Sequence, residues 1–306
     1  MPDDISYVEH ASDVIAAAAD LARAGRKFAL ITSVGIEGGA AREVGSLALV
    51  DDRGAMAGYL SNGCIDSDIQ FHATEALRLG RKQLVRYGNG SRFVDLKLPC
   101  GGALDVLIDP APDLDAVLDA SDRLTARHPT DLAFTTPDGE QHRFTYLPKF
   151  RLVLAGRGAI FRAVAEVAQS AGFQIGLLSP QEDDLAAVGH LAITAPVHLT
   201  SPDQAITLAD LDAHAGFLTL FHDHEWEPAL VRAALDTQAR YVGCLGSLRT
   251  QAARKDTLRA MGVQEDDLAR LRGPIGLVPS LREAPLIAIS AIAEIVTHLP
   301  AAITRS

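Results

Sequence analysis

The stretch Arg151-Leu-Val-Leu-Ala-Gly-Arg-Gly158 predicts the fold of the second half of the chain. Its first five residues form the apolar run of a buried strand, and the residues that follow predict a helix to about Ala171 and a second strand over 173–178. A strand, a Gly-x-Gly turn and a helix in this order are typical of a Rossmann-like α/β fold with a parallel sheet, in which helix N–H groups meet a phosphate. We therefore expect Gly156, Arg157 and Gly158 to contact a phosphate-bearing ligand.

Two residues near this turn argue against a nicotinamide dinucleotide as that ligand. Phe161 stands where a third glycine usually lets the helix pack closely on the strand. Ser179 ends the second strand, where an Asp or Glu usually binds the ribose hydroxyls. The pattern therefore supports the fold more strongly than it supports NAD or NADP, which stay an alternative.

Two later strands are predicted to end in polar residues. Residues 216–221 are followed by His222-Asp223-His224, and residues at the carboxyl ends of parallel strands line the ligand crevice. His222 is therefore a candidate to bind a ligand or a metal or to move protons. The alternative is that these residues cap the next helix and face solvent.

The next predicted strand, over 241–245, is followed by Gly246-Ser247 and by Arg249. Glycine and serine at the start of a helix suit a phosphate or an oxyanion, so these three residues are candidates for the same ligand. Arg249 and the nearby Arg254 can equally belong to an ordinary solvated helix face.

Two cysteines in the first half of the chain are flanked by glycine. Cys64 follows Gly63, and Cys100 precedes Gly101 and Gly102. Glycine removes side chains where a ligand approaches and allows positive φ. The apolar spacing after Ser61-Asn62-Gly63 predicts a helix with Cys64 in its first turn, where the helix dipole favours a thiolate.

A thiolate at these positions can act as a nucleophile, a sulfur carrier or a ligand for a soft metal. The alternative is that both cysteines are small buried residues, as free cysteines often are. For the third cysteine, Cys244 in an apolar run, burial is the favoured interpretation.

Composition limits the classes of protein that fit. The chain has 306 residues, of which 48% are hydrophobic, and we expect two α/β domains at residues 1–148 and 149–306. Three cysteines make no disulfide framework, and the acidic start resembles no signal peptide, so a reducing cytoplasmic location is expected. No stretch is apolar enough for a membrane span. A formal net charge of −11 argues against general nucleic-acid binding.

Together these motifs closely resemble the xanthine dehydrogenase accessory (XdhC/CoxI) family over nearly the whole chain. The matching segments are residues 37–45 with Arg42 and Gly45, 58–68, 100–110, 153–158, 222–224, 241–249, 274–277 and 287–296. The chain departs from the family pattern at Ser179, at Asn62, where glycine is usual, and at Pro285, which is shifted by one place.

The resemblance implies that the chain binds molybdenum cofactor, protects it and delivers it to a molybdenum hydroxylase of the xanthine, aldehyde or CO dehydrogenase type. A cysteine desulfurase would supply the terminal sulfido ligand. Cys64 and Cys100 would approach the metal or its sulfur, and Arg42 would face the pterin or phosphate oxygens. The Rossmann-like loop would take the phosphate, or the nucleotide of a dinucleotide form.

Such a protein is a maturation factor with no turnover of its own. The alternatives are an NAD(P)-dependent oxidoreductase and a scaffold in which the cysteines are inert. Apolar positions in the helix over 286–296 exceed what one core needs, which also predicts a homodimer.

Overall fold

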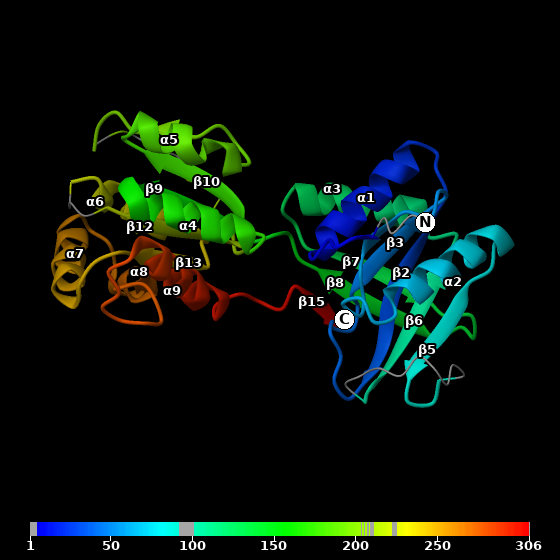
Figure 1. The fold of residues 1–306 in the computed structure, drawn as a ribbon. Coiled ribbons are helices and arrows are strands. Elements are labelled where there is room, and N and C mark those ends of the chain that lie inside the picture. The colour runs from blue at the N-terminus through cyan, green and yellow to red at the C-terminus, as the bar shows by residue number, and fades with distance from the viewer. Residues whose placement is uncertain are drawn as a thin grey trace. The chain divides into compact units, whose positions relative to one another are not determined.

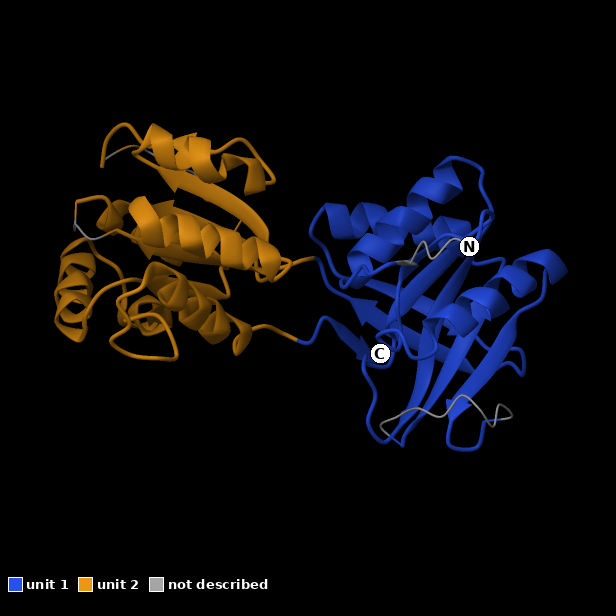
Figure 2. Ribbon diagram, viewed as in Figure 1, with its two compact units in different colours: residues 1–148, 301–306 blue, residues 149–300 orange. Residues whose placement is uncertain are grey.

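The structure is a computed structural model that describes residues 5–91, 101–202, 204, 206, 208, 211–221 and 225–305. The chain divides into two compact units, unit 1 with residues 1–148 and 301–306 and unit 2 with residues 149–300 (Figure 2). The end of the chain thus differs from the expectation that the second domain runs to residue 306. Ile303–Arg305 forms a strand that pairs with Phe144–Tyr146 of unit 1, so the polar tail gains backbone hydrogen bonds there.

Unit 1 contains two sheets and three helices among its described residues (Figure 1). Its elements are β1 (Ile5–Ser6), α1 (Ala11–Arg23), β2 (Phe28–Glu37), β3 (Leu47–Asp51), β4 (Met56–Gly58), α2 (Asp66–Leu79), β5 (Gln83–Gly88), β6 (Ala103–Asp109), α3 (Leu114–Thr125), β7 (Thr130–Thr135), β8 (Gln141–Tyr146) and β15 (Ile303–Arg305). The larger sheet has the order β1-β4-β3-β2-β6-β5 and the smaller one β15-β8-β7. Only the β1–β4 pair is parallel; the other described pairs of unit 1 are antiparallel.

The central strands of the larger sheet are buried on both faces because most of their residues are apolar. In β2, Phe28 and Leu30 point into a core shared with α1, α3 and the smaller sheet. Ala29 and Ile31 point to the opposite face, which α2 covers. This alternation follows from the two-residue period of a strand, and it fixes both faces of the sheet at once.

Unit 2 is a parallel six-stranded sheet between two layers of helices (Figure 1). Its elements are β9 (Arg151–Gly156), α4 (Gly158–Ser170), β10 (Gln174–Ser179), α5 (Glu182–Val188), a 3₁₀ turn (Gly189–Leu191), β11 (Val197–His198), β12 (Ala215–Leu220), α6 (Glu227–Leu235), β13 (Tyr241–Cys244), α7 (Leu248–Ala260), α8 (Glu265–Arg270), β14 (Leu271–Arg272) and α9 (Ala284–Val296). The strand order β11-β10-β9-β12-β13-β14 is that of the Rossmann fold, which confirms the predicted fold class.

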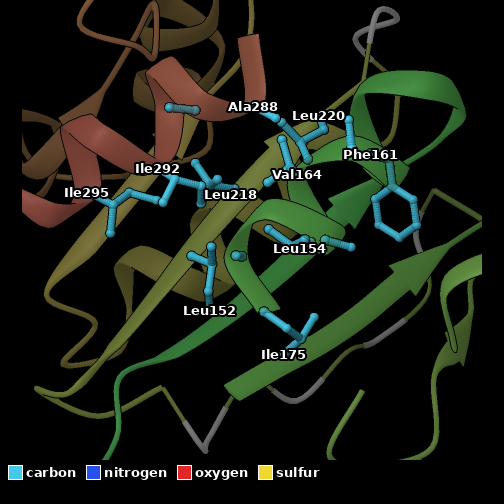
Figure 3. Close-up of a cluster of buried hydrophobic side chains, with 14 of the residues drawn as sticks. Leu152, Leu154, Phe161, Val164, Ile175, Leu218, Leu220, Ala288, Ile292 and Ile295 are labelled. Atoms are coloured by element: carbon cyan, nitrogen blue, oxygen red, sulfur yellow. The ribbon is translucent and has the colours of Figure 1, made fainter. Parts of the chain in front are cut away.

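One core of unit 2 lies between the sheet and helices α4 and α9 (Figure 3). Leu152, Leu154 and Leu218 from the strands meet Val164 of α4 and Ile292 of α9 there. The other face packs against α6, α7 and α8. No helix of the described residues is long and apolar enough to cross a membrane.

Candidate functional site

The loops that carry the candidate residues of unit 1 leave the larger sheet at one end. Glu37, the last residue of β2, pairs with Ala103, the first residue of β6. Leu47 at the start of β3 lies beside β2, and Gly58 at the end of β4 lies beside Ala48 of β3. The antiparallel pairing therefore gathers the segments with Arg42, with Cys64 and with Gly101-Gly102 at the same end of the sheet.

Cys64 lies just before α2 and not in its first turn, which corrects the sequence prediction. The helix begins at Asp66 with Ile65 as its N-cap, and the Cys64 side chain is exposed. The sequence predicted Ser61 as part of a helix cap. In the structure its hydroxyl accepts a hydrogen bond from the amide of Ile65 at 2.9 Å, and Ile65 is itself the N-cap residue. Asn62 and Gly63 both have positive φ, of 55° and 97°, so the turn before Cys64 is tight.

Asp66 holds this turn in place, a role that the sequence analysis missed. Its carboxylate is fully buried and accepts hydrogen bonds from the amides of Leu60 (2.9 Å), Ser61 (3.1 Å) and Gly63 (2.6 Å) and from the Ser61 hydroxyl (2.9 Å). A carboxylate that accepts several bonds is a strong local anchor. Cys64 is thus an exposed thiol on a fixed loop.

Arg42 is largely enclosed by protein groups. Its guanidinium donates to the Glu9 carbonyl at 2.6 Å, lies 2.9 Å from the Glu9 carboxylate and stacks over the Tyr59 ring at 4.6 Å from its centroid. Its Nε is buried and has no hydrogen-bond partner within the described ranges. The Glu9 carboxylate also accepts a hydrogen bond from the Tyr59 hydroxyl, which raises the pKa of Tyr59.

An aromatic contact joins this cluster to the Cys64 loop. The rings of Tyr7 and Tyr59 meet edge to face at 5.3 Å. A Cβ placed on Gly63 would lie 3.8 Å from the Tyr7 hydroxyl. Arg42 and the loop of Cys64 therefore belong to one cluster.

Gly102 serves the packing of the sheet end. A Cβ there would lie 2.4 Å from the Glu37 carbonyl oxygen and 2.6 Å from that of Gly39. Gly101 has open space around it but a φ of +69°, which favours glycine. Cys100 and His222 lie outside the described residues.

The Gly-x-Gly turn of unit 2 borders a pocket of about 420 Å³. The Gly158 amide, which was expected to meet a phosphate, donates to the Asp184 carboxylate at 2.7 Å. Arg162 donates to the same carboxylate at 2.6 Å, and Asp184 is 3% exposed. Gly156 meets the neighbouring strand, since a Cβ there would lie 2.7 Å from the Leu220 Cβ.

A second pocket of unit 2, of about 670 Å³, contains three of the predicted residues, Gly246, Ser247 and Arg249. All three are exposed, and Ser247 caps α7 by accepting a hydrogen bond from the Thr250 amide at 3.2 Å. The remaining wall is mostly apolar and includes Leu245, Leu248, Pro274, Ile275, Val278 and Ile287. A pocket with apolar walls and a few polar groups at one edge suits a small organic ligand.

Glu294 fixes one wall of this 670 Å³ pocket. It accepts hydrogen bonds from the Tyr241 hydroxyl at 2.8 Å and from the Gly276 amide. The Ser290 hydroxyl accepts a further bond from the Val278 amide at 2.8 Å. These contacts tie β13, the segment after β14 and α9 together, although the three are distant in sequence.

Arg254 lies beneath the same pocket and is not part of a solvated face. It is 5% exposed, pairs with Glu227 at 2.9 Å and donates to the Leu245 carbonyl at 2.8 Å. Cys244 beside it is fully buried, as predicted, and burial raises the pKa of its thiol to about 12. Arg249, in contrast, is exposed at the pocket rim.

No group of three or more His, Cys, Asp or Glu side chains with the geometry of a metal site occurs among the residues that the structure describes. Cys64 is the exposed thiol of the described residues, and an exposed thiol is available to a soft metal.

Comparisons with known proteins show what the chain is similar to. The family model of the XdhC Rossmann domain matches residues 152–295, and the model of the XdhC and CoxI family matches residues 21–88. The chain is 26% identical to the molybdenum cofactor insertion chaperone PaoD of Escherichia coli over 309 residues, which span 96% of this chain and 90% of PaoD. It is 30% identical to the uncharacterized protein YqeB of Escherichia coli over 145 residues, which span 47% of this chain and 26% of YqeB.

The fold has a solved counterpart. The crystal structure of a xanthine dehydrogenase from Bacillus halodurans superimposes with a TM-score of 0.73 at 20% identity, covering 92% of this chain and 94% of that one. The two family matches lie one in each unit, on the segments that carry Cys64 and the 670 Å³ pocket. The chain therefore belongs to the XdhC and CoxI family.

Proposed function

We propose that this protein is a molybdenum cofactor chaperone that protects the cofactor and inserts it into a molybdenum hydroxylase. The observation that carries the proposal is the relationship to the insertion chaperone PaoD over 96% of the chain. The site in unit 1 supports it, because an exposed thiol on a rigid loop lies in one cluster with an arginine.

The donor groups of unit 1 fit the metal end of this cargo. Thiolates bind soft or sulfur-rich centres, and Cys64 is accessible without unfolding of its loop. We propose Cys100 as the second thiol at this end. Arg42 lies in one cluster with the Cys64 loop, and a guanidinium suits carbonyl and phosphate oxygens of a pterin.

We propose that the 670 Å³ pocket of unit 2 binds a phosphate or nucleotide group. Its volume lies within the range of small-molecule sites. Ser247 and Arg249 supply a hydroxyl and a cation at the rim, and the apolar wall suits a planar ring. A dinucleotide form of the cofactor would make fuller use of this pocket than molybdopterin alone.

We expect three protein contacts: a hydroxylase client, a cysteine desulfurase that supports sulfuration of the cofactor, and a second copy of the chain in a homodimer. The exposed apolar residues Leu286, Ile289 and Val296 on α9 support contacts that tolerate salt. We place these contacts in the cytoplasm, because two of the cysteines are free thiols. Neither nucleic acid nor membrane is expected as a partner of so acidic a chain.

The protein then has no turnover of its own. The alternative, an NAD(P)-dependent oxidoreductase, would need a ribose-binding carboxylate at the end of β10. Ser179 stands there, fully buried, and its hydroxyl accepts a hydrogen bond from the Gln181 amide at 3.1 Å. His222 would be the proton-transfer group of such an enzyme.

Anaerobic purification from a host that makes molybdenum cofactor tests the proposal. We expect molybdenum by metal analysis, together with the fluorescence of oxidised pterin, in the wild-type protein. Cys64→Ala should lower both by about tenfold, equivalent to about 1.4 kcal/mol of binding free energy. Bound NAD(H) with turnover, and no pterin, would favour the oxidoreductase.

A further inference from the structure

We infer that Asp184 closes the Gly-x-Gly turn of unit 2 to dinucleotide phosphates by placing its own carboxylate where a phosphate would bind. The carboxylate oxygens receive the Gly158 amide at 2.7 Å and the Arg162 Nε at 2.6 Å. In a nucleotide-binding Rossmann unit the amide at the start of this helix faces the pyrophosphate. Here the Asp184 carboxylate accepts the hydrogen bond from that amide.

Burial makes the exclusion strong. Asp184 is 3% exposed, so water and salt screen its charge poorly. A phosphate that approached the Gly158 amide would have to share the position with a carboxylate and would meet a like charge at short range. Arg162 balances the charge of Asp184, so this ion pair offers no net positive charge to a second anion.

The other features of the nucleotide fingerprint serve the fold as well. Gly156 allows the approach of Leu220, and Phe161 is fully buried in the core of α4 and α9. The Ser179 hydroxyl is bonded within its own turn. The strand, turn and helix therefore have structural roles in this unit that need no nucleotide at the turn.

This inference goes beyond the proposed function, since it assigns a specificity-determining residue to a turn that the cargo is not proposed to use. A protein that failed to retain the cofactor would not contradict the inference about Asp184. A dinucleotide titration of the purified protein tests that inference separately. The two can therefore fail independently.

The experiment is titration calorimetry with ADP-ribose and NAD on the full-length wild-type chain and on Asp184→Asn and Asp184→Ser. Wild type should show no saturable binding at the Gly-x-Gly turn at about 1 mM ligand, which means none that Gly158→Asp abolishes. Either variant that stays folded by thermal melting should bind at least about tenfold tighter than this limit, with an affinity that falls as salt rises. Adding Arg162→Gln should remove the gain, because the freed guanidinium is the cation that the new anion would meet.

Two results would overturn the inference. One is saturable wild-type binding of ADP-ribose or NAD at about 10 μM that Gly158→Asp abolishes. The other is a folded Asp184 variant that binds no tighter than wild type. Wild-type binding of this kind overturns the inference even if both variants fail to fold.

Discussion

The buried carboxylate of Asp66 accepts a hydrogen bond of 2.6 Å from the amide of Gly63, the residue directly before Cys64. Each of its oxygens accepts two bonds from the turn over residues 60–63. The thiol proposed to bind the cargo is therefore positioned by a side chain that itself needs no contact with the cargo.

Asp66→Asn should destabilise the protein and loosen the Cys64 loop. Asparagine keeps one acceptor oxygen but turns a second donor toward the amide or hydroxyl donors of the turn, which costs about 3 kcal/mol at a fully buried site. Chemical denaturation measures this loss, and cofactor retention at a temperature where the variant is folded measures the effect on Cys64. Ser67→Ala, at an exposed position one residue away, should change stability by less than about 0.5 kcal/mol. Equal effects of the two substitutions would show that Asp66 has no special role.

Glu294 should support the 670 Å³ pocket through its two acceptor oxygens. Glu294→Leu leaves the Gly276 amide and the Tyr241 hydroxyl without acceptors, which should cost about 2 kcal/mol and weaken cargo retention. Glu294→Gln still offers an oxygen to Gly276, and the Tyr241 hydroxyl can accept from the new amide, so this variant should lose about half as much. Denaturation curves of the two variants provide the comparison. A glutamine variant as unstable as the leucine variant would contradict this geometry.

The buried pair of Arg254 and Glu227 should be far more sensitive than an exposed pair. Arg254→Ala leaves the Glu227 carboxylate, 2% exposed, without its cation and should cost about 3–5 kcal/mol. Adding Glu227→Gln should recover part of the loss, because the uncompensated charge is then gone. Arg259→Ala, which breaks an exposed pair with Glu265, is the matched control and should leave the urea midpoint unchanged. Additive losses in the Arg254 and Glu227 double variant would argue against a direct coupling.

Cys244 should make stability depend on pH above neutrality. Burial raises the pKa of its thiol from 9.0 to about 12 in the folded protein, whereas the unfolded chain ionises near the ordinary value. The contribution is therefore fully present below pH 9.0 and is lost toward about 12, by about 1.4 kcal/mol for each pH unit. Between about pH 8 and about pH 10 the unfolding free energy of wild type should fall more steeply with rising pH than that of Cys244→Ala.

Alkylation at neutral pH gives an independent check on both described cysteines. In a Cys100→Ala background, iodoacetamide should modify the exposed Cys64 and leave the buried Cys244 untouched until urea unfolds the chain. Modification of Cys244 at the rate of Cys64 in the folded protein would mean that the core of unit 2 opens readily.

Apolar patterns made much of the fold predictable, because strands and helices depend on local spacing. The strand–turn–helix start at Arg151 is an example, and β9 and α4 lie where that pattern placed them. The pairing of β15 with β8 was not predictable, since it joins residues more than a hundred positions apart through backbone bonds that any sequence can make. The strands β1 and β11 were not predictable either, because two residues each are too few to show an apolar pattern.

The candidate sites were predictable as residue types but not as contacts. The flanking glycines pointed to Cys64. The sequence nevertheless predicted too early a helix start, because Ser61 is a common N-cap residue but here bonds to the amide of Ile65 within the turn. An Asp two residues after Cys64, at the start of a helix, was a signal for the role of Asp66 that could have been used. Asp184 gave no such signal, because its partner amide is 26 positions away and only the packing of α5 brings them together.

Transfer of the cargo to an apo-hydroxylase tests the central claim most directly. Protein purified anaerobically with its cofactor is mixed with an apo molybdenum hydroxylase, and the activity that appears in the hydroxylase is measured. We predict activity with wild type, activity reduced by about tenfold with Cys64→Ala at equal protein concentration, and no oxidation of NAD(P)H by the chaperone alone. Folded wild-type protein that carries no pterin and activates no hydroxylase, or that turns over NAD(P)H by itself, would contradict the account.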